Sequence, residues 1–129
     1  MKKILAITIY LVFQAAQGQS EPIPVKGGYK VEIQTSAICE LCKETLEKDL
    51  VFEKGVKAAF LDLETKKMMI TYNPKKTSAA SLRKRITMVG YHADTLARNP
   101  DAYSKLPFCC KDGSHGTPIP QVPLPSKMN

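Results

Sequence analysis

At 129 residues, the chain is long enough for one ordinary domain and too short for a second sizeable core. Its net charge of +7 includes the basic run Arg83-Lys84-Arg85, but no aromatic residues interleave with that run. We therefore expect a solvated helix face there and exclude nucleic acid as a partner.

The first 18 residues have the three-part layout of a secretory signal peptide. Lys2 and Lys3 precede an uncharged ten-residue run, and small residues follow as far as Gly18. A run of that length is too short for a membrane-spanning helix, which needs about 20 apolar residues. We expect residues 1–18 to be removed, which lowers the net charge to +5. The remaining protein is then periplasmic or secreted, from a bacterium, with no stable membrane insertion.

The next segments predict a strand followed by a helix. Residues 19–28 are rich in Pro and Gly and read as a flexible lead-in. Residues 29–35 alternate apolar and polar side chains, which is typical of a half-buried strand. Cys42, Leu46 and Leu50 then recur at intervals of four, which predicts a helix to about residue 51.

Residues 56–63 and 67–72 are rich in strand formers and flank a short turn, so they predict a β-hairpin. A second helix, capped by Thr77 and closed by Gly90, should follow. A last strand over residues 91–96 completes the order βαββαβ. This order predicts an α+β fold, the ferredoxin-like open-faced sandwich, over residues 29–97.

Two further segments follow the predicted sandwich. Residues 98–115 form a C-terminal extension that begins with a short helical turn at Asn99-Pro100 and contains Cys109, Cys110 and His115. Residues 116–129 hold four prolines and little apolar mass, so we expect a disordered tail.

The four cysteines form two local pairs. Disulfides are common in exported chains, but the α-carbons of Cys109 and Cys110 lie about 3.8 Å apart, below the usual disulfide range of about 4.4–6.8 Å. Cys39 and Cys42 flank the predicted start of a helix, where unpaired N–H groups favour thiolates. We expect both sulfurs to converge on one point outside the protein body. Soft thiolates of this kind select Cu(I), Zn(II) and similar ions.

The residues around this pair resemble a known family. The stretch CELCKETLEKDLVFEKGVKAAFLDLETKKMMITYNPKKTSAASLRKRITMVGYHAD is similar to the heavy-metal-associated domain of copper chaperones, of the periplasmic mercury-binding protein and of metal-pumping ATPases. The agreement includes the CxxC motif, Tyr72-Asn73-Pro74 and Gly90-Tyr91, without a gap. The resemblance implies a βαββαβ fold in which Cys39 and Cys42 bind an ion and pass it to a partner.

The same resemblance implies the cargo and its partner. Cu(I) is the expected ion, with Zn(II) or Hg(II) as alternatives. The partner would be a membrane metal transporter or another metal-binding protein of the cell envelope. Tyr91 occupies the place where the family commonly puts a residue that shields or tunes the ion.

Four other residues are candidates for accessory ligands: His92, Cys109, Cys110 and His115. His92 is either a third ligand or an ordinary exposed histidine at the start of a strand. Cys109, Cys110 and His115 admit three interpretations: a second soft-metal site, a lid that donates thiolates to the first site, or disulfide partners for Cys39 and Cys42.

The sequence therefore predicts a non-enzymatic periplasmic protein that binds a soft metal ion, copper above all, and transfers or sequesters it. One alternative is a thiol–disulfide redox protein, because CxxC is also a redox motif. The other is a structural or interaction domain in which Cys39 and Cys42 form a permanent disulfide.

Overall fold

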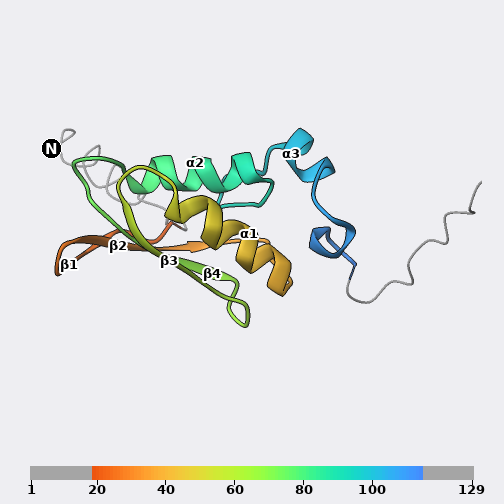
Figure 1. Ribbon diagram of the computed structural model, residues 1–129, viewed down its shortest axis with the longest axis horizontal. Coiled ribbons are helices and arrows are strands. Elements are labelled where there is room, and N and C mark those ends of the chain that lie inside the picture. The colour runs from red at the N-terminus through yellow and green to blue at the C-terminus, as the bar shows by residue number, and fades with distance from the viewer. Residues whose placement is uncertain (1–18, 115–129) are drawn as a thin grey trace, which may run out of the picture.

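The computed structural model describes residues 19–114. The predicted signal segment, His115 and the predicted tail lie outside the described residues. Two helices cover one face of a four-stranded antiparallel sheet, and a C-terminal extension lies beyond the second helix (Figure 1). Within the described range, every helix is too short or too polar to span a membrane.

The sheet has the order β1-β2-β4-β3, with strands Ile23–Val25, Gly28–Gln34, Lys67–Tyr72 and Val56–Asp62 in that order. The helices above it are α1 (Glu40–Val51) and α2 (Ala79–Val89). The extension contains the short helix α3 (Pro100–Ser104) and the 3-10 turn η1 (Phe108–Cys110). The predicted α+β ferredoxin-like class and the β3–β4 hairpin are confirmed.

The core lies between the sheet and the two helices. Alternate strand residues and one stripe of each helix point into it, as their periodicity predicts. Its fully buried members include Val31, Ile33, Leu46, Leu50, Leu61, Met68, Ile70, Leu82 and Ile86. Each such side chain contributes about 1.5–3 kcal/mol by leaving water. The N-cap of α2 is Ser78, whose side chain accepts the Ser81 N–H, so the prediction of Thr77 as cap was wrong by one residue.

The predicted strand over residues 91–96 does not form. Only Ala93 pairs with Thr35, and the chain then turns so that Ala93 also pairs with Leu96. Asp94 stands at the turn with a left-handed φ of 50°. It exchanges hydrogen bonds with the Gln34 backbone through its own N–H and through Oδ1, and this holds the reversal in place.

The fourth strand comes instead from the segment predicted to be a flexible lead-in. β1 pairs with β2 through a two-residue turn at Lys26-Gly27 and occupies the edge that the last strand of a βαββαβ fold would take. Gly28 permits this arrangement, because a Cβ there would lie 2.2 Å from the Tyr72 carbonyl oxygen. The Pro and Gly content of residues 19–28 indicated a loop, but residues 23–25 form a strand because they pair with β2.

The expectation of a wholly solvated basic face on the second helix was wrong for Arg83. This side chain is buried, its Nε lies 2.7 Å from Asp94 Oδ2, and an Nη donates to the Ser20 carbonyl. The guanidinium thus links Ser20, α2 and the turn at Asp94. Arg85 is half-exposed and pairs with Asp49 on α1 and with Glu53 in the turn that follows α1.

The outer edge of the sheet is β3. A register shift between Val56 and Ala58 interrupts its ladder with β4. Farther along, Glu47 on α1 accepts the Leu61 N–H at 2.8 Å.

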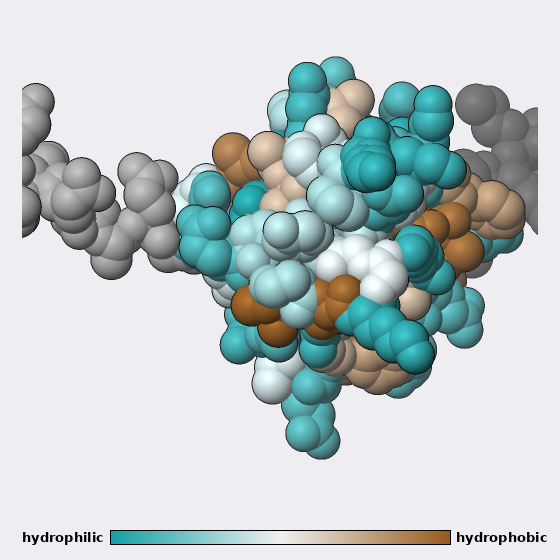
Figure 2. Space-filling model, turned by 90° about the vertical axis from the view of Figure 1, so that its left-hand side faces the viewer, coloured by the Kyte–Doolittle hydropathy of each residue, from teal (hydrophilic) through white to brown (hydrophobic). Residues whose placement is uncertain are grey.

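Figure 2 shows the end of the molecule that lies on the left in Figure 1, away from η1. Hydrophilic side chains prevail on this face, and the hydrophobic ones are scattered among them. Scattered apolar side chains are ordinary on a protein surface and call for no partner there.

Candidate metal centre

The cysteine loop between β2 and α1 is held by backbone and hydroxyl contacts. Thr35 Oγ1 donates to the Lys66 carbonyl and accepts the Ala37 N–H, and Ser36 Oγ accepts the His92 N–H. Cys39 then takes the N-cap position of α1, where its sulfur accepts the Cys42 N–H at 3.4 Å. A cysteine therefore fills the position usually held by Ser, Thr, Asp or Asn, at the positive end of the helix.

Three sulfurs meet at this helix end. Cys39 Sγ lies 2.9 Å from Cys42 Sγ and 3.7 Å from Cys110 Sγ. All three lie within 4.8 Å of one another and form the one group of three or more metal-ligating side chains found in residues 19–114. All four cysteines are unbridged in the structure. The arrangement corresponds to the lid interpretation of the sequence, with Cys110 as the residue that reaches the pair.

The extension carries Cys110 back to α1 from the far end of α2. Figure 1 shows η1 beside the first turn of α1, although its residues follow α3 in the chain. Arg98 forms an ion pair with Asp112 at 2.7 Å, and its guanidinium stacks 3.5 Å from the centre of the Tyr103 ring. Tyr103 Oη accepts the Asp112 N–H. These three residues, which we call the extension clamp, were not recognised in the sequence, because no short-range pattern links them.

The thiols differ in exposure. Cys42 is 0% exposed and Cys110 2%, whereas Cys39 is partly exposed. The expectation that both sulfurs of the CxxC motif converge outside the protein body was therefore only half correct. They do converge, but η1 packs over Cys42 and leaves Cys39 as the contact with solvent.

The local environment favours ionisation of Cys42 first. Burial raises the pKa of the Cys39 thiol, and its hydrogen bond to Cys42 raises it further. Burial also opposes ionisation of Cys42, but hydrogen bonds from Cys39 and from the Ile38 backbone outweigh it, so the pKa of Cys42 is lowered. The pKa of Cys110 is raised, mainly by burial.

Tyr91 lies buried beside the sulfur cluster. The side chain is 1% exposed, and its hydroxyl is the one buried side-chain N or O atom in the described part of the chain without a hydrogen bond. That hydroxyl is close enough to the Cys42 and Cys110 sulfurs to interact with both, and burial raises the pKa of Tyr91, so it stays protonated. The position predicted to shield the ion is thus occupied by a buried tyrosine whose hydroxyl lies near two of the sulfurs.

The other candidate ligands stand apart from the sulfur cluster. His92 is exposed, and its Nδ1 accepts the Arg98 N–H at 3.2 Å. Cys109 is not a member of the group of three sulfurs, and its carbonyl accepts the Ser114 hydroxyl. His115 lies outside the described residues. The structure therefore unites Cys39, Cys42 and Cys110 and leaves the roles of the other three as predictions.

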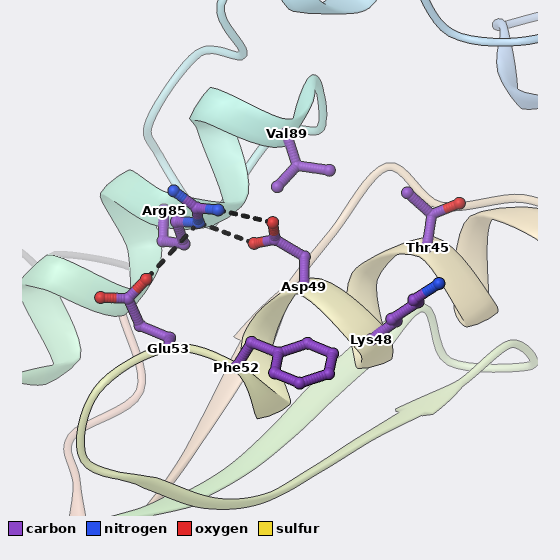
Figure 3. Close-up of a pocket in the computed structure, with 7 residues that line it drawn as sticks. All are labelled: Thr45, Lys48, Asp49, Phe52, Glu53, Arg85 and Val89. Carbon is purple, nitrogen blue, oxygen red and sulfur yellow. Dashed lines mark hydrogen bonds and ion pairs between the residues drawn. The ribbon is translucent and has the colours of Figure 1, made fainter.

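A hollow lies elsewhere, between α1 and α2 (Figure 3). It has a volume of about 400 Å³, and its lining includes Phe52, Val89 and the Arg85–Asp49 ion pair. The lining contains no cysteine or histidine. It is thus separate from the thiol chemistry.

Comparison with known proteins finds a similarity to copper-exporting ATPases over part of the chain. No family model matches the chain. Over 67 residues it is 36% identical to a copper-exporting P-type ATPase of Staphylococcus epidermidis, a match that covers 51% of this chain and 8% of the ATPase. A copper-exporting P-type ATPase of Staphylococcus aureus is 32% identical over 84 residues, which is 60% of this chain and 10% of that protein. The predicted resemblance is confirmed over this segment.

The chain spans a tenth or less of the length of these curated relatives. A solved CopZ metallochaperone is 23% identical, with a TM-score of 0.48, and the match covers 50% of this chain and 97% of that one. A likeness of this strength carries no argument about activity.

Proposed function

We propose that the protein binds Cu(I) through the thiolates of Cys39 and Cys42 and delivers or withholds that ion. The observation that carries this proposal is the pair of sulfurs 2.9 Å apart at the start of α1, of which Cys42 has a lowered pKa. Thiolates are the ligands that Cu(I) prefers. The sequence similarity to copper-exporting ATPases supports copper as the cargo.

The donor set favours Cu(I) over Zn(II). Structural zinc sites are almost always four-coordinate, whereas the described residues bring three sulfurs and no carboxylate or imidazole to this point. Hg(II) is also soft and is the remaining competitor.

Location and partner belong to the same proposal. The predicted signal segment would export the protein to the bacterial envelope, where a membrane metal transporter or another metal-binding protein would receive the ion. Binding and transfer of this kind need no catalysis. Amino-terminal sequencing of protein recovered from the envelope tests the export, and a start at Met1 would contradict it.

Anaerobic titration with Cu(I) against a chromogenic chelator tests the ion-binding proposal. The protein should take up one ion per chain, and replacement of both Cys39 and Cys42 by Ser should abolish this uptake. Cys109→Ser is the matched control and should bind like the unaltered protein. Undiminished uptake by the double variant would refute the proposal.

The redox alternative predicts a different measurement. A redox nucleophile is a low-pKa thiol that solvent reaches, but here the thiol with the lowered pKa is Cys42, which is fully buried. We therefore expect no turnover in an insulin-reduction assay. The redox function would be favoured if the protein reduced insulin faster than the reductant alone does and if Cys42→Ser removed that difference.

A further inference from the structure

The strongest unexplained feature is the third sulfur. Cys110 lies 71 positions from Cys39 in the chain, yet the two sulfurs are 3.7 Å apart. Three thiolates around one ion at a bond length of about 2.3 Å would stand about 4.0 Å from one another in a planar triangle. The observed Cys39–Cys110 separation is close to that value, and the Cys39–Cys42 separation must open by about 1 Å.

The surroundings of Cys110 give an independent reason to expect a charged sulfur cluster. The Tyr91 hydroxyl is buried beside Cys42 and Cys110 and makes no hydrogen bond of normal geometry. A buried polar group without a partner costs about 1–3 kcal/mol. Metal-bound thiolates would accept this O–H and remove the cost. Tyr91 is thus a positioning residue that is satisfied when the cluster is ionised.

The extension holds Cys110 in place without help from the sulfurs. The clamp of Arg98, Tyr103 and Asp112 closes the loop that leads to η1, and the Asn99 N–H donates to the Thr87 carbonyl at the end of α2. Because these contacts involve none of the sulfurs, they would hold the third thiol beside the pair before an ion binds. Less ordering remains to be done on binding, which favours affinity.

From this geometry we propose that Cys110 is a third ligand, so that one chain holds Cu(I) in a site of three thiolates. The inference rests on the proposed function, because it assumes that Cys39 and Cys42 bind the same ion. In the first exchange with a thiol-bearing acceptor, the bond between copper and Cys110 sulfur would break as the acceptor thiolate forms its own bond, and the bonds to Cys39 and Cys42 would then be exchanged in the same way. The freed Cys110 thiolate takes a proton from solvent, and copper remains Cu(I) throughout.

X-ray absorption at the copper edge tests this inference on protein loaded anaerobically with one equivalent of Cu(I). All samples carry Cys109→Ser, so that the neighbouring thiol cannot substitute. The reference should show three sulfur neighbours and remain monomeric in sedimentation, and addition of Cys110→Ser should leave two. In chelator competition, the addition of Cys110→Ser should weaken Cu(I) binding at least about tenfold. Loss of an outer-shell partner alone already weakens metal affinity by about this factor.

The two hypotheses fail in different ways. Two sulfur neighbours in the reference, or a count that Cys110→Ser leaves unchanged, would overturn the third ligand while leaving the CxxC site intact. Three neighbours obtained only in a dimer would overturn it as well. Cys110→Ser could lose Cu(I) binding because it misfolds, which a changed far-ultraviolet circular dichroism spectrum would reveal. In that case Cys110→Ala is the deciding variant. If the inference holds, it must fold and bind Cu(I) with two sulfur neighbours. Uptake that persists without Cys39 and Cys42 would instead overturn the proposed function.

Discussion

Replacement of Tyr91 by Phe should move two properties in opposite directions. The change removes one oxygen from a side chain that is 1% exposed and leaves the ring in place. That oxygen lies near the Cys42 and Cys110 sulfurs but makes no hydrogen bond of normal geometry. Its removal relieves a buried, unsatisfied group, so we expect the free energy of unfolding to rise by about 1 kcal/mol.

With Cu(I) bound, the Tyr91 hydroxyl should donate a hydrogen bond to a metal-bound thiolate. A hydrogen bond to a charged acceptor contributes about 1.5–3 kcal/mol. Loss of the Tyr91 hydroxyl should therefore weaken Cu(I) binding about 10- to 150-fold, since 1.4 kcal/mol corresponds to a factor of ten.

Urea unfolding of the reduced, metal-free protein and Cu(I) competition with a chelator measure these two quantities on the same samples. Tyr29→Phe is the matched control, because Tyr29 is partly exposed at the opposite end of β2, and both quantities should stay within about 0.5 kcal/mol. If Tyr91→Phe lost stability without metal and bound Cu(I) like the unaltered protein, the hydroxyl would serve packing of the thiol state, and the reasoning would be wrong.

Three other predictions test the structure around the site. Arg98→Ala removes an ion pair and a cation–π contact from the extension clamp, together about 1–2 kcal/mol. The open form of η1 should become about 5–30 times more populated, and the buried thiols should react faster with a thiol reagent to that extent, whereas Lys105→Ala should change little. Arg83→Met leaves the Asp94 carboxylate buried without its partner and should cost about 3–5 kcal/mol in urea unfolding, against less than about 1 kcal/mol for the half-exposed Arg85→Met. Equal losses would show that the Arg83 pair is not effectively buried. Leu46→Ala should cost about 2–5 kcal/mol in the same assay, and a loss below 1 kcal/mol would contradict its place in the core.

The sequence predicted best what depends on neighbouring residues. The two main helices, the β3–β4 hairpin and the cap at Gly90 follow from apolar spacing and local turn chemistry, and they were found within one or two residues. The position of Cys39 and Cys42 at the start of a helix followed for the same reason.

Features that depend on distant partners were not predicted. Residues 23–25 and residues 91–96 compete for the same edge of β2, and this competition decides which segment completes the sheet. The turn at Asp94 depends on the guanidinium of Arg83, which comes from α2. A charge run cannot show that Arg83 is buried. Likewise, the sequence does not single out Cys110 among the accessory candidates, because the clamp that returns the extension to α1 has no short-range signature.

The interrupted edge of β3 affects how the protein behaves at high concentration. A free strand edge is a template on which a strand of another molecule can add. Here the register shift near Val56 disturbs that template, and Glu47 already occupies the outward N–H of Leu61. Growth of the sheet from one molecule into the next would have to undo both features, so crowded preparations should resist fibre formation at this edge.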